Sequence, residues 1–292
     1  MKLFLQWSLI FMLFVANIYY TPPSYSRGIT GVIGTNVAKE KFASLAQQEQ
    51  FKAVGCIKQD NKIIASCVLI SPQCCLTAAH VFDDNLRLKN LTIEINGRSY
   101  KGSKKIIHKK YKKDNIDLAL IFLNIPIVDV VPATLYSGSG ELHCVSTFVG
   151  YGAFGTALKP DMEVDNVEKI AGTNMIDQIG GNIPNFSTYP SHFLLEDLDN
   201  PSDTSCCNSL GESQPTPLEY IPTGGDSGGG LFFEENGRWY LIGIFSEFEF
   251  TLGSLNKTGL YGTVAAFVRT TLFSDWIDSN TKSEKKHESN EK

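Results

Sequence analysis

Residues 224–230 read Gly-Gly-Asp-Ser-Gly-Gly-Gly, a serine and an aspartate set among five glycines. A serine hydroxyl is a poor nucleophile unless a base removes its proton and the developing oxyanion is stabilised. Glycines on either side let the backbone turn so that N–H groups converge on one point, which larger side chains would obstruct. We therefore interpret Ser227 as a candidate nucleophile, with the N–H groups of Gly225 and Ser227 as its oxyanion hole. The alternative is a glycine-rich hairpin corner beside the next strand.

Two segments upstream supply a candidate base and a candidate acid. Thr77-Ala-Ala-His80 follows an apolar segment, and a histidine at a strand end can act as base and then acid near neutral pH. Asp117 lies among apolar neighbours, where a charge is costly to bury unless it is paired. An imidazolium would be a suitable partner, and the carboxylate would fix the tautomer of its ring. Taken singly, His80 and Asp117 could each be an ordinary structural residue.

The three motifs together resemble the trypsin/chymotrypsin family of serine proteases, in that family's chain order of His, Asp and Ser. The resemblance extends over roughly residues 28–278. It includes the further segments Val32–Asn36, Val149–Gly152, Ile242–Ser246, Gly259–Tyr261 and Trp276–Ile277. It implies an all-β fold of two antiparallel six-stranded β-barrels with a C-terminal helix. His80 and Asp117 would come from the first barrel and Ser227 from the second, with the active site between them.

The resemblance also implies a role for the acid that precedes the nucleophile. In the family, the freed amine of the mature N-terminus pairs with this acid, which is Asp226 here. Arg27-Gly28 is one candidate processing point, and a start at Val32 is the alternative.

Substrate preference follows from the same comparison. The residue six before the nucleophile forms the base of the family's primary specificity pocket, and it is Ile221 here. Gly259 matches a pocket wall, Phe248 would narrow the entrance, and Ser246 to Phe248 would line the edge along which substrate pairs. Because an apolar base leaves a basic side chain unpaired, we expect an apolar residue before the cut. The alternative is that Glu247 or Glu249 reaches in and restores a basic preference.

The sequence departs from the family pattern around the active site. Val81 and Thr223 stand where cysteines are usual, Cys67 is displaced from its expected place, and Gly230 replaces a common proline. These changes alter the disulfide scheme and leave the three catalytic candidates intact. Of the seven cysteines, at least one must remain unpaired, and the adjacent pairs at 74–75 and 206–207 lack the spacing of a zinc site. We expect structural or free thiols, no metal and no cofactor.

Composition and the two ends of the chain limit the remaining choices. The sequence is 42% hydrophobic with a net charge of −5, which favours a folded core and argues against nucleic acid as a partner. Residues 1–26 have the pattern of a signal peptide, so we expect an exported, secreted or periplasmic protein. An uncleaved membrane anchor and a core helix are the alternatives. We expect the protease domain at residues 28–279, a disordered polar tail at 280–292 and a monomer.

Short apolar runs separated by turn residues predict a barrel or sandwich rather than a helical fold. The expected strands are Ile63–Ser71, Leu91–Ile95, Leu118–Leu123, Cys144–Val149, Gly230–Phe233 and Trp239–Phe245. Asn236-Gly237 predicts a hairpin between the last two. An apolar stripe predicts a helix over Ala265–Ser279, and the proline- and glycine-rich stretch Ala153–Ile221 suggests a loop-rich insertion.

Three functions are compatible with these residues. The first is an active serine endopeptidase acting on protein or peptide substrates. The second is an inactive protease homologue that binds a partner, which loss of a triad residue or oxyanion glycine would favour. The third is a serine esterase, although the surrounding all-β pattern is not that of an α/β-hydrolase.

Overall fold

The computed structural model describes residues 31–33, 37–83, 86–152, 154–157, 168–184, 186–222, 224–249 and 260–281. The expected signal peptide at residues 1–26 lies outside this part of the chain. So does most of the expected tail, although Asn280 and Thr281 form the end of a helix rather than a disordered segment. No helix within the described ranges is long and apolar enough to span a membrane.

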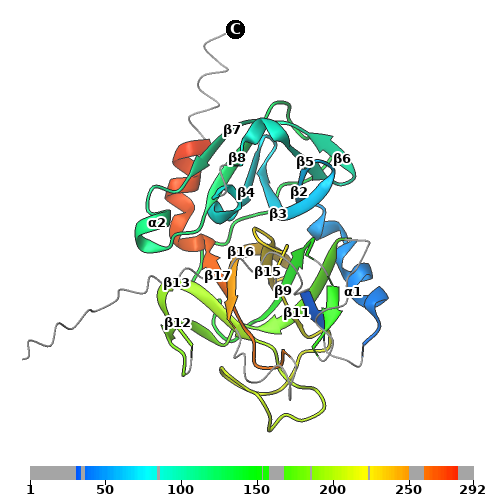
Figure 1. Cartoon of the computed structure of the whole chain (residues 1–292), viewed down its shortest axis with the longest axis vertical. Helices are drawn as coiled ribbons and strands as arrows, with labels where there is room; N and C mark the ends of the chain where they lie inside the picture. Colours follow the sequence, from blue (N-terminus) through cyan, green and yellow to red (C-terminus); the bar gives the residue numbers. More distant parts are fainter. Residues whose placement is uncertain are drawn as a thin grey trace, which may run out of the picture.

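The first barrel is an antiparallel sheet with the strand order β6-β5-β2-β3-β4-β8-β7. β6 and β7 form one run broken only at Lys101, yet they pair with opposite edges of the sheet, through Ile93↔Tyr100 and Ile107↔Ala119. The sheet therefore closes on itself as a six-stranded barrel, drawn in cyan and teal in Figure 1. Its strands are β2 (Val54–Gln59), β3 (Lys62–Ser71), β4 (Cys74–Thr77), β5 (Leu91–Ile95), β6 (Arg98–Tyr100), β7 (Gly102–Ile107) and β8 (Ala119–Leu123).

The second barrel repeats this arrangement with the order β11-β9-β15-β16-β17-β13-β12. Its edges are again consecutive in the chain, since only Ile176 and Asp177 separate β11 from β12. The predicted pair of six-stranded barrels is confirmed. The strands are β9 (Val145–Gly150), β11 (Ile170–Met175), β12 (Gln178–Asn182), β13 (Thr188–Asp197), β15 (Gly230–Glu235), β16 (Arg238–Glu249) and β17 (Val264–Arg269).

Smaller elements surround the barrels. A three-stranded sheet has the order β10-β1-β14, from β1 (Gly31–Ile33), β10 (Phe154–Thr156) and β14 (Tyr220–Ile221). The α-helices are α1 (Lys39–Ala46), α2 (Tyr111–Asp114) and a last helix at residues 274–281. Short 3₁₀ helices are η1 (Glu49–Phe51), η2 (Ala79–Phe82), η3 (Leu88–Asn90) and η4 (Thr270–Phe273). The last helix, red in Figure 1, returns to the first barrel, where Trp276 packs against His108 with ring centroids 4.9 Å apart.

All six predicted strands are present, with small shifts at their ends. Asn236 and Gly237 join β15 to β16 with φ values of 53° and 75°. Two consecutive positive φ values match the hairpin turn that this dipeptide favours, so the predicted hairpin is confirmed.

Two predictions about elements are wrong. Residues 264–269 form strand β17, and the C-terminal helix begins only at residue 274, after η4. Val264 to Val268 are buried on both faces of the strand, which hides the alternation that would distinguish a strand from a helix. The stretch 153–221 is not a loop-rich insertion, because it supplies β10 to β14. Its Gly180 lies at a register shift between β12 and β13, against the backbone of Pro190.

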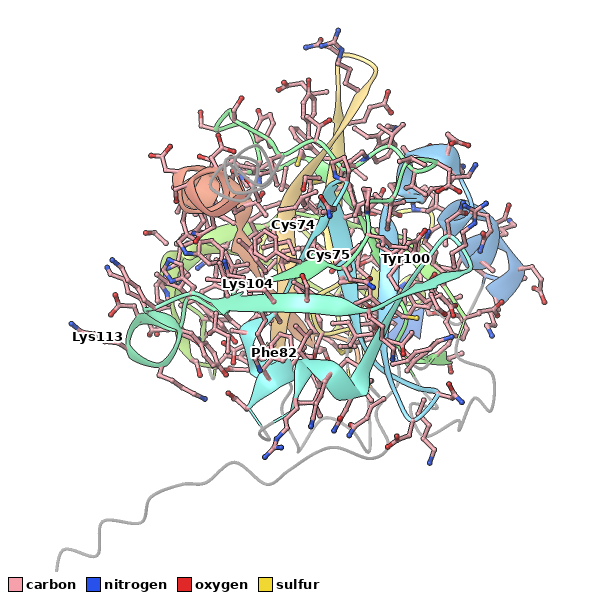
Figure 2. The ribbon with its side chains drawn as sticks, turned by 90° about the horizontal axis from the view of Figure 1, so that it is seen from above. Cys74, Cys75, Phe82, Tyr100, Lys104 and Lys113 are labelled. Atoms are coloured by element: carbon pink, nitrogen blue, oxygen red, sulfur yellow. A yellow bond between two sulfur atoms is a disulfide. The ribbon has the colours of Figure 1, made fainter. Side chains whose placement is uncertain are left out.

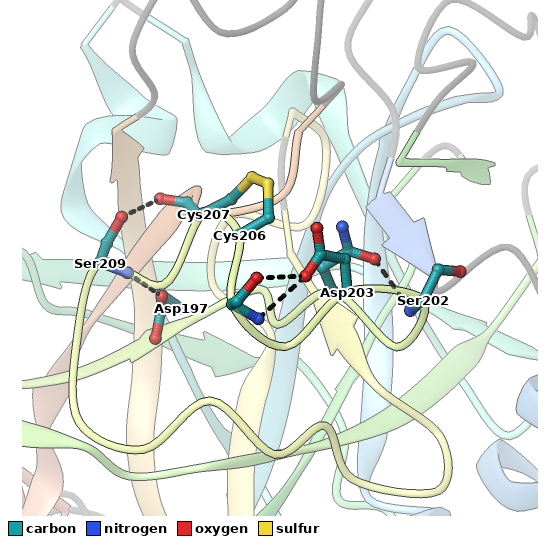
Figure 3. The surroundings of a disulfide bond; sticks show 9 residues. Asp197, Ser202, Asp203, Cys206, Cys207 and Ser209 are labelled. Atoms are coloured by element: carbon teal, nitrogen blue, oxygen red, sulfur yellow. Dashed lines mark hydrogen bonds between the residues drawn. A yellow bond between two sulfur atoms is a disulfide. The ribbon is translucent and has the colours of Figure 1, made fainter.

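The cysteines adopt two states. Cys206 and Cys207 are joined in a disulfide between adjacent residues, on the loop that follows β13 (Figure 3). The other five cysteines are not part of this disulfide, namely Cys56, Cys67, Cys74, Cys75 and Cys144. Cys74 and Cys75 lie on β4 inside the first barrel, whereas Lys113 extends outward from its surface (Figure 2). The structure therefore contains both free thiols and one covalent pair.

Candidate active site

Elements of both barrels bring the three candidate residues together. His80 lies on η2, which follows directly from the buried strand β4. Asp117 comes two residues before β8, the neighbour of β4 in the sheet, and its side chain is almost completely buried. Ser227 lies in the turn before β15 of the second barrel. The pairing Thr77↔Ala119 aligns the ends of β4 and β8, and this alignment places His80 close to Asp117.

The side chains form a continuous hydrogen-bonded chain. His80 Nε2 lies 2.7 Å from Ser227 Oγ, and His80 Nδ1 lies 2.6 Å from Asp117 Oδ2. The backbone N–H of His80 also donates to Asp117 Oδ1 at 2.8 Å, which fixes the carboxylate relative to the ring. Because the carboxylate accepts from Nδ1–H, Nε2 is left as the acceptor that can receive the serine proton.

The pKa values of the pair follow from its hydrogen bonds. Burial lowers the pKa of His80, but the hydrogen bond and charge of Asp117 outweigh burial, and the pKa lies above its usual value. Burial would raise the pKa of Asp117, but the hydrogen bond and charge of His80, with a hydrogen bond from Ser246, hold it below its usual value. Each partner thus favours the charged form of the other.

The turn around Ser227 is held tightly against the first barrel. The N–H of Ser66 donates to the carbonyl of Ser227 at 2.8 Å, and the N–H of Gly228 donates to Phe245 on β16 at 2.9 Å. Gly228 has φ +82°, and a Cβ there would lie only 2.1 Å from Thr77 Oγ1. Gly225 also has a positive φ, of 93°. Backbone conformation therefore favours glycine at both positions, and at Gly228 the close approach of the barrels requires it as well.

Asp226, which precedes Ser227, is completely buried. Its Oδ1 accepts a hydrogen bond from the N–H of Gly152 at 2.7 Å, and its Oδ2 accepts one from the hydroxyl of Tyr220 at 2.9 Å. Its expected pairing with a freed amine, for a chain that starts after Arg27 or at Val32, is not tested by the described contacts and stays a prediction.

The expected pocket residues are distributed around the same region. Ile221 is fully buried in the core of the second barrel, and Phe248 packs against that core from the edge of β16. Ser246 donates from Oγ to Asp117 Oδ2 at 2.6 Å, so its side chain belongs with the triad candidates. Gly259 lies outside the described residues.

The two glutamates on β16 have partners away from Ile221. Glu247 Oε1 accepts from Asn115 Nδ2 at 3.2 Å, and Glu249 Oε2 accepts from the N–H of Ser187 at 2.8 Å. Burial raises the pKa of Glu247, and its charge in turn contributes to the raised pKa of His80.

A comparison with family models matches residues 43–174 to the trypsin model. This range contains His80 and Asp117 and reaches β11 of the second barrel. The same range includes most of the first barrel. It also includes the pairing of β4 with β8, which places His80 beside Asp117.

Over residues 43–174 the chain is similar to the trypsin family.

The comparison with curated proteins found no match. The trypsin match ends before Ser227, so the position of this serine relative to the other two residues comes from the structure alone.

Two contacts of this trypsin-like site were missed from the sequence. Ser246 was interpreted only as a substrate-edge residue, because it lies on the other barrel and its contact with Asp117 is made only when the barrels pack. Tyr220 received no interpretation, because it lies in no motif. Its neighbour Ile221 was singled out by its distance from Ser227, and the same count would have placed Tyr220 beside the active-site loop.

Proposed function

We propose that this trypsin-like protein is an exported serine endopeptidase with Ser227 as nucleophile, His80 as base and Asp117 as the carboxylate that orients the imidazole. The observation that carries the proposal is the unbroken hydrogen-bonded chain from Ser227 Oγ through both ring nitrogens of His80 to Asp117. Both distances, 2.7 Å and 2.6 Å, are within the range of a hydrogen bond.

The reaction would proceed through an acyl-enzyme. Ser227 Oγ attacks the carbonyl carbon of the peptide bond while His80 Nε2 accepts the serine proton. The N–H groups of Gly225 and Ser227 donate to the oxyanion of the tetrahedral intermediate. Protonated His80 then gives its proton to the leaving amine, and a water molecule activated by the same imidazole hydrolyses the ester. Asp117 remains ionised throughout and stabilises the imidazolium.

We propose an apolar residue before the scissile bond. Ile221 supports this preference because an apolar base offers no partner to a guanidinium or ammonium group. Glu247 is hydrogen-bonded to Asn115, and Glu249 is hydrogen-bonded to Ser187. These contacts argue against either carboxylate serving as an acid at the base of the pocket.

The substrates are proteins or peptides, as is usual for trypsin-like proteases. We propose residues 28–279 as the protease domain and residues 1–26 as the export signal. The proposed active unit is a monomer, because His80, Asp117 and Ser227 all come from one chain.

The first prediction tests the nucleophile. Ser227→Ala should lower amide hydrolysis by about 10⁶-fold without unfolding the protein, because it removes one hydroxyl from a turn. Hydrolysis of a fluorogenic peptide and covalent labelling by a fluorophosphonate are measured together, with Ser205→Ala as the control on an exposed loop. Activity of Ser227→Ala within about tenfold of the parent would contradict the assignment. Labelling of the parent without peptide turnover would favour an esterase, and neither labelling nor turnover an inactive homologue.

The second prediction concerns specificity. Peptides that differ only in having Arg, Phe, Leu or Ala before the cut should be hydrolysed fastest with an apolar residue at that position. The values of kcat/KM are compared at one ionic strength, because salt screens any attraction of a basic substrate. A strong preference for Arg would show that an acid reaches the pocket.

A further inference from the structure

The last part of β16 has one edge that no described strand covers. β15 pairs with β16 only as far as Ile244, whereas β17 stays paired with it as far as Glu249. The main-chain groups on the other edge of residues 246–249 are therefore available to an added strand. This edge begins beside the nucleophile, because Phe245 is hydrogen-bonded to the turn that carries Ser227. An extended peptide substrate can pair here.

A register shift in β16 turns Glu247 towards the first barrel. The pairing with β17 shifts between Phe245 and Glu247, so Ser246 is an extra residue in the strand. Successive side chains of a regular strand point to opposite faces, and an extra residue interrupts this alternation. Two consecutive side chains therefore reach the segment before β8. Ser246 Oγ donates to Asp117 Oδ2 at 2.6 Å, and Glu247 Oε1 accepts from Asn115 Nδ2 at 3.2 Å.

Glu247 acts on the charge of the candidate base His80. Burial lowers the pKa of His80, but the hydrogen bond and charge of Asp117 raise it, and the charges of Asp83 and Glu247 add to this increase. The imidazole side chain is 32% exposed and Glu247 is half-buried, so a ligand can reach both of them. Asp83 is already paired with Lys112 at 2.8 Å, whereas no described lysine or arginine forms an ion pair with Glu247.

The geometry of an extended peptide decides which substrate residue meets Glu247. Ser227 attacks the carbonyl of the residue whose side chain enters the proposed pocket over Ile221. Because successive side chains of an extended chain point to opposite faces, the side chain one residue earlier points away from Ile221 and towards His80. Glu247 lies on that side with the neutral amide of Asn115 as its hydrogen-bond partner. A carboxylate accepts several hydrogen bonds, so it can bind a donor from the substrate as well.

We propose that Glu247 selects lysine or arginine at the second residue before the scissile bond. This inference rests on the proposed endopeptidase function, and it adds to the apolar preference that Ile221 supports at the residue next to the bond. A basic side chain at the earlier position would donate to the carboxylate in a charge-assisted hydrogen bond. The amide of Asn115 already donates to Oε1 and holds that carboxylate in place. The preferred substrates therefore carry a basic residue followed by an apolar one before the cut.

The first test compares two peptides that share one apolar residue before the cut and have Arg or Gln one position earlier. The parent should hydrolyse the Arg peptide with a kcat/KM about 10- to 100-fold higher, the effect of a hydrogen bond to a charged group. Glu247→Gln should reduce this ratio to less than threefold, because its amide oxygen can still accept from Asn115 but carries no charge. Glu249→Gln is the matched control, since Glu249 lies on the same strand and accepts from the N–H of Ser187. It should keep the ratio of the parent within threefold.

Three results of this comparison would overturn the proposal. The first is a ratio below threefold in the parent, and the second is a ratio that Glu247→Gln leaves unchanged. The third is an equal loss of the ratio in Glu247→Gln and Glu249→Gln, because a general negative potential would then explain the preference. If no peptide with any of the tested residues before the cut is hydrolysed, the proposed endopeptidase function itself is contradicted. The two failures are therefore distinguishable.

The second test measures the same ratio in the parent against pH and needs no variant. The titration of His80 affects kcat/KM of both peptides equally and cancels in their ratio. The charge of Glu247 is present above its pKa and lost below it. Burial raises this pKa, as do the charges of Glu249 and Asp117. The other titratable groups that face Glu247 are Asp117, His80, Glu249, Tyr111 and Tyr189.

The preference for Arg should therefore be full at about pH 8 and should fall on the acid side, at a pH above the usual glutamate pKa of about 4.3. The measurement is the ratio of the two kcat/KM values at each pH, at one ionic strength. A ratio that stays constant from about pH 8 to about pH 4 would overturn the proposal, because the selecting group would then not be a carboxylate that titrates in this range.

Discussion

At the scale of single residues, the site shows how a buried carboxylate is satisfied. Asp117 accepts from the backbone N–H and Nδ1 of His80 and from Ser246 Oγ. The sequence predicted His80 and Asp117, because a histidine after a buried strand and an aspartate among apolar residues are both visible in a linear pattern. It could not predict the third donor, since Ser246 comes from the other barrel and meets Asp117 only when the barrels pack.

The third prediction tests this donor. Ser246→Ala should lower kcat roughly 10- to 100-fold with little change in KM, because a lost hydrogen bond to a charged group leaves Asp117 less able to orient His80. Ser274→Ala is the control, since its hydroxyl donates to the carbonyl of Thr271 in the C-terminal region. A variant in which KM rises and kcat stays unchanged would show that Ser246 serves substrate binding alone.

At the scale of elements, the predicted short strands and one hairpin turn were correct, whereas β17 and the strands between residues 170 and 197 were not predicted. The Asn236-Gly237 hairpin follows from the positive φ values that both residues tolerate. β17 was mistaken for a helix because its apolar residues are buried on both faces, and periodicity then carries no information. The strands between residues 170 and 197 were missed because prolines and glycines interrupt them at bulges and bends.

The fourth prediction tests why glycine follows the nucleophile. Gly228→Ala should displace the turn of Ser227 and abolish most activity, because its Cβ would lie 2.1 Å from Thr77 Oγ1 and 2.4 Å from the carbonyl of Ser66. Gly237→Ala is the matched control, with a similar φ of +75° and no atom within 4 Å of the added Cβ. The control should cost only the backbone strain of about 1–2 kcal/mol, measured by thermal unfolding. Equal losses of stability in both variants, with activity retained, would show that the barrels do not require this close approach.

At the scale of the whole molecule, the proposed active site needs both barrels, because His80 and Asp117 lie in the first barrel and Ser227 lies in the second. The trypsin match spans residues 43–174, whereas Ser227 lies in the second barrel, where the N–H of Ser66 from the first barrel holds its carbonyl. The fold was predictable because short motifs mark it, and the same motifs single out His80, Asp117 and Ser227 as the proposed triad. Contacts made by residues outside any motif, such as those of Tyr220, depend on packing across the chain and were not predictable.

A group of buried carboxylates in the second barrel also depends on packing across the chain and was not predicted from the sequence. Burial is the first cause that raises their pKa values, to about 7 for Asp177 and Asp199 and to about 8 for Asp197 and Glu219. Burial also raises the pKa of Glu196 well above its usual value, and one of its oxygens has no hydrogen-bond partner among the described residues. No three of the described acidic, histidine or cysteine side chains are arranged to hold a metal ion. Burial of these groups favours their protonated forms, because the charged form loses its hydration.

The fifth prediction follows from the sign of these shifts. In the unfolded chain the same carboxyls have pKa values of about 4, so between pH 4 and pH 8 the native state binds more protons than the unfolded state. Their contribution to the free energy of unfolding is therefore largest near pH 4 and falls as the pH rises towards 8. Asp199→Asn removes one of these groups and the charge that raises the pKa values of Asp177, Asp197 and Glu219.

The variant should match the parent in Tm near pH 4.5. At pH 8 its Tm should exceed that of the parent, by roughly 2–4 °C for each kcal/mol by which the substitution raises the free energy of unfolding. Glu234→Gln, at an exposed position on β15, should leave the dependence of Tm on pH unchanged and serves as the control. Thermal unfolding across this pH range decides the matter, because Asn can replace only a carboxyl that is already neutral in the native state. If Asp199→Asn instead lowers Tm most strongly at pH 8, then Asp199 is ionised in the folded protein and stabilised by a positive partner.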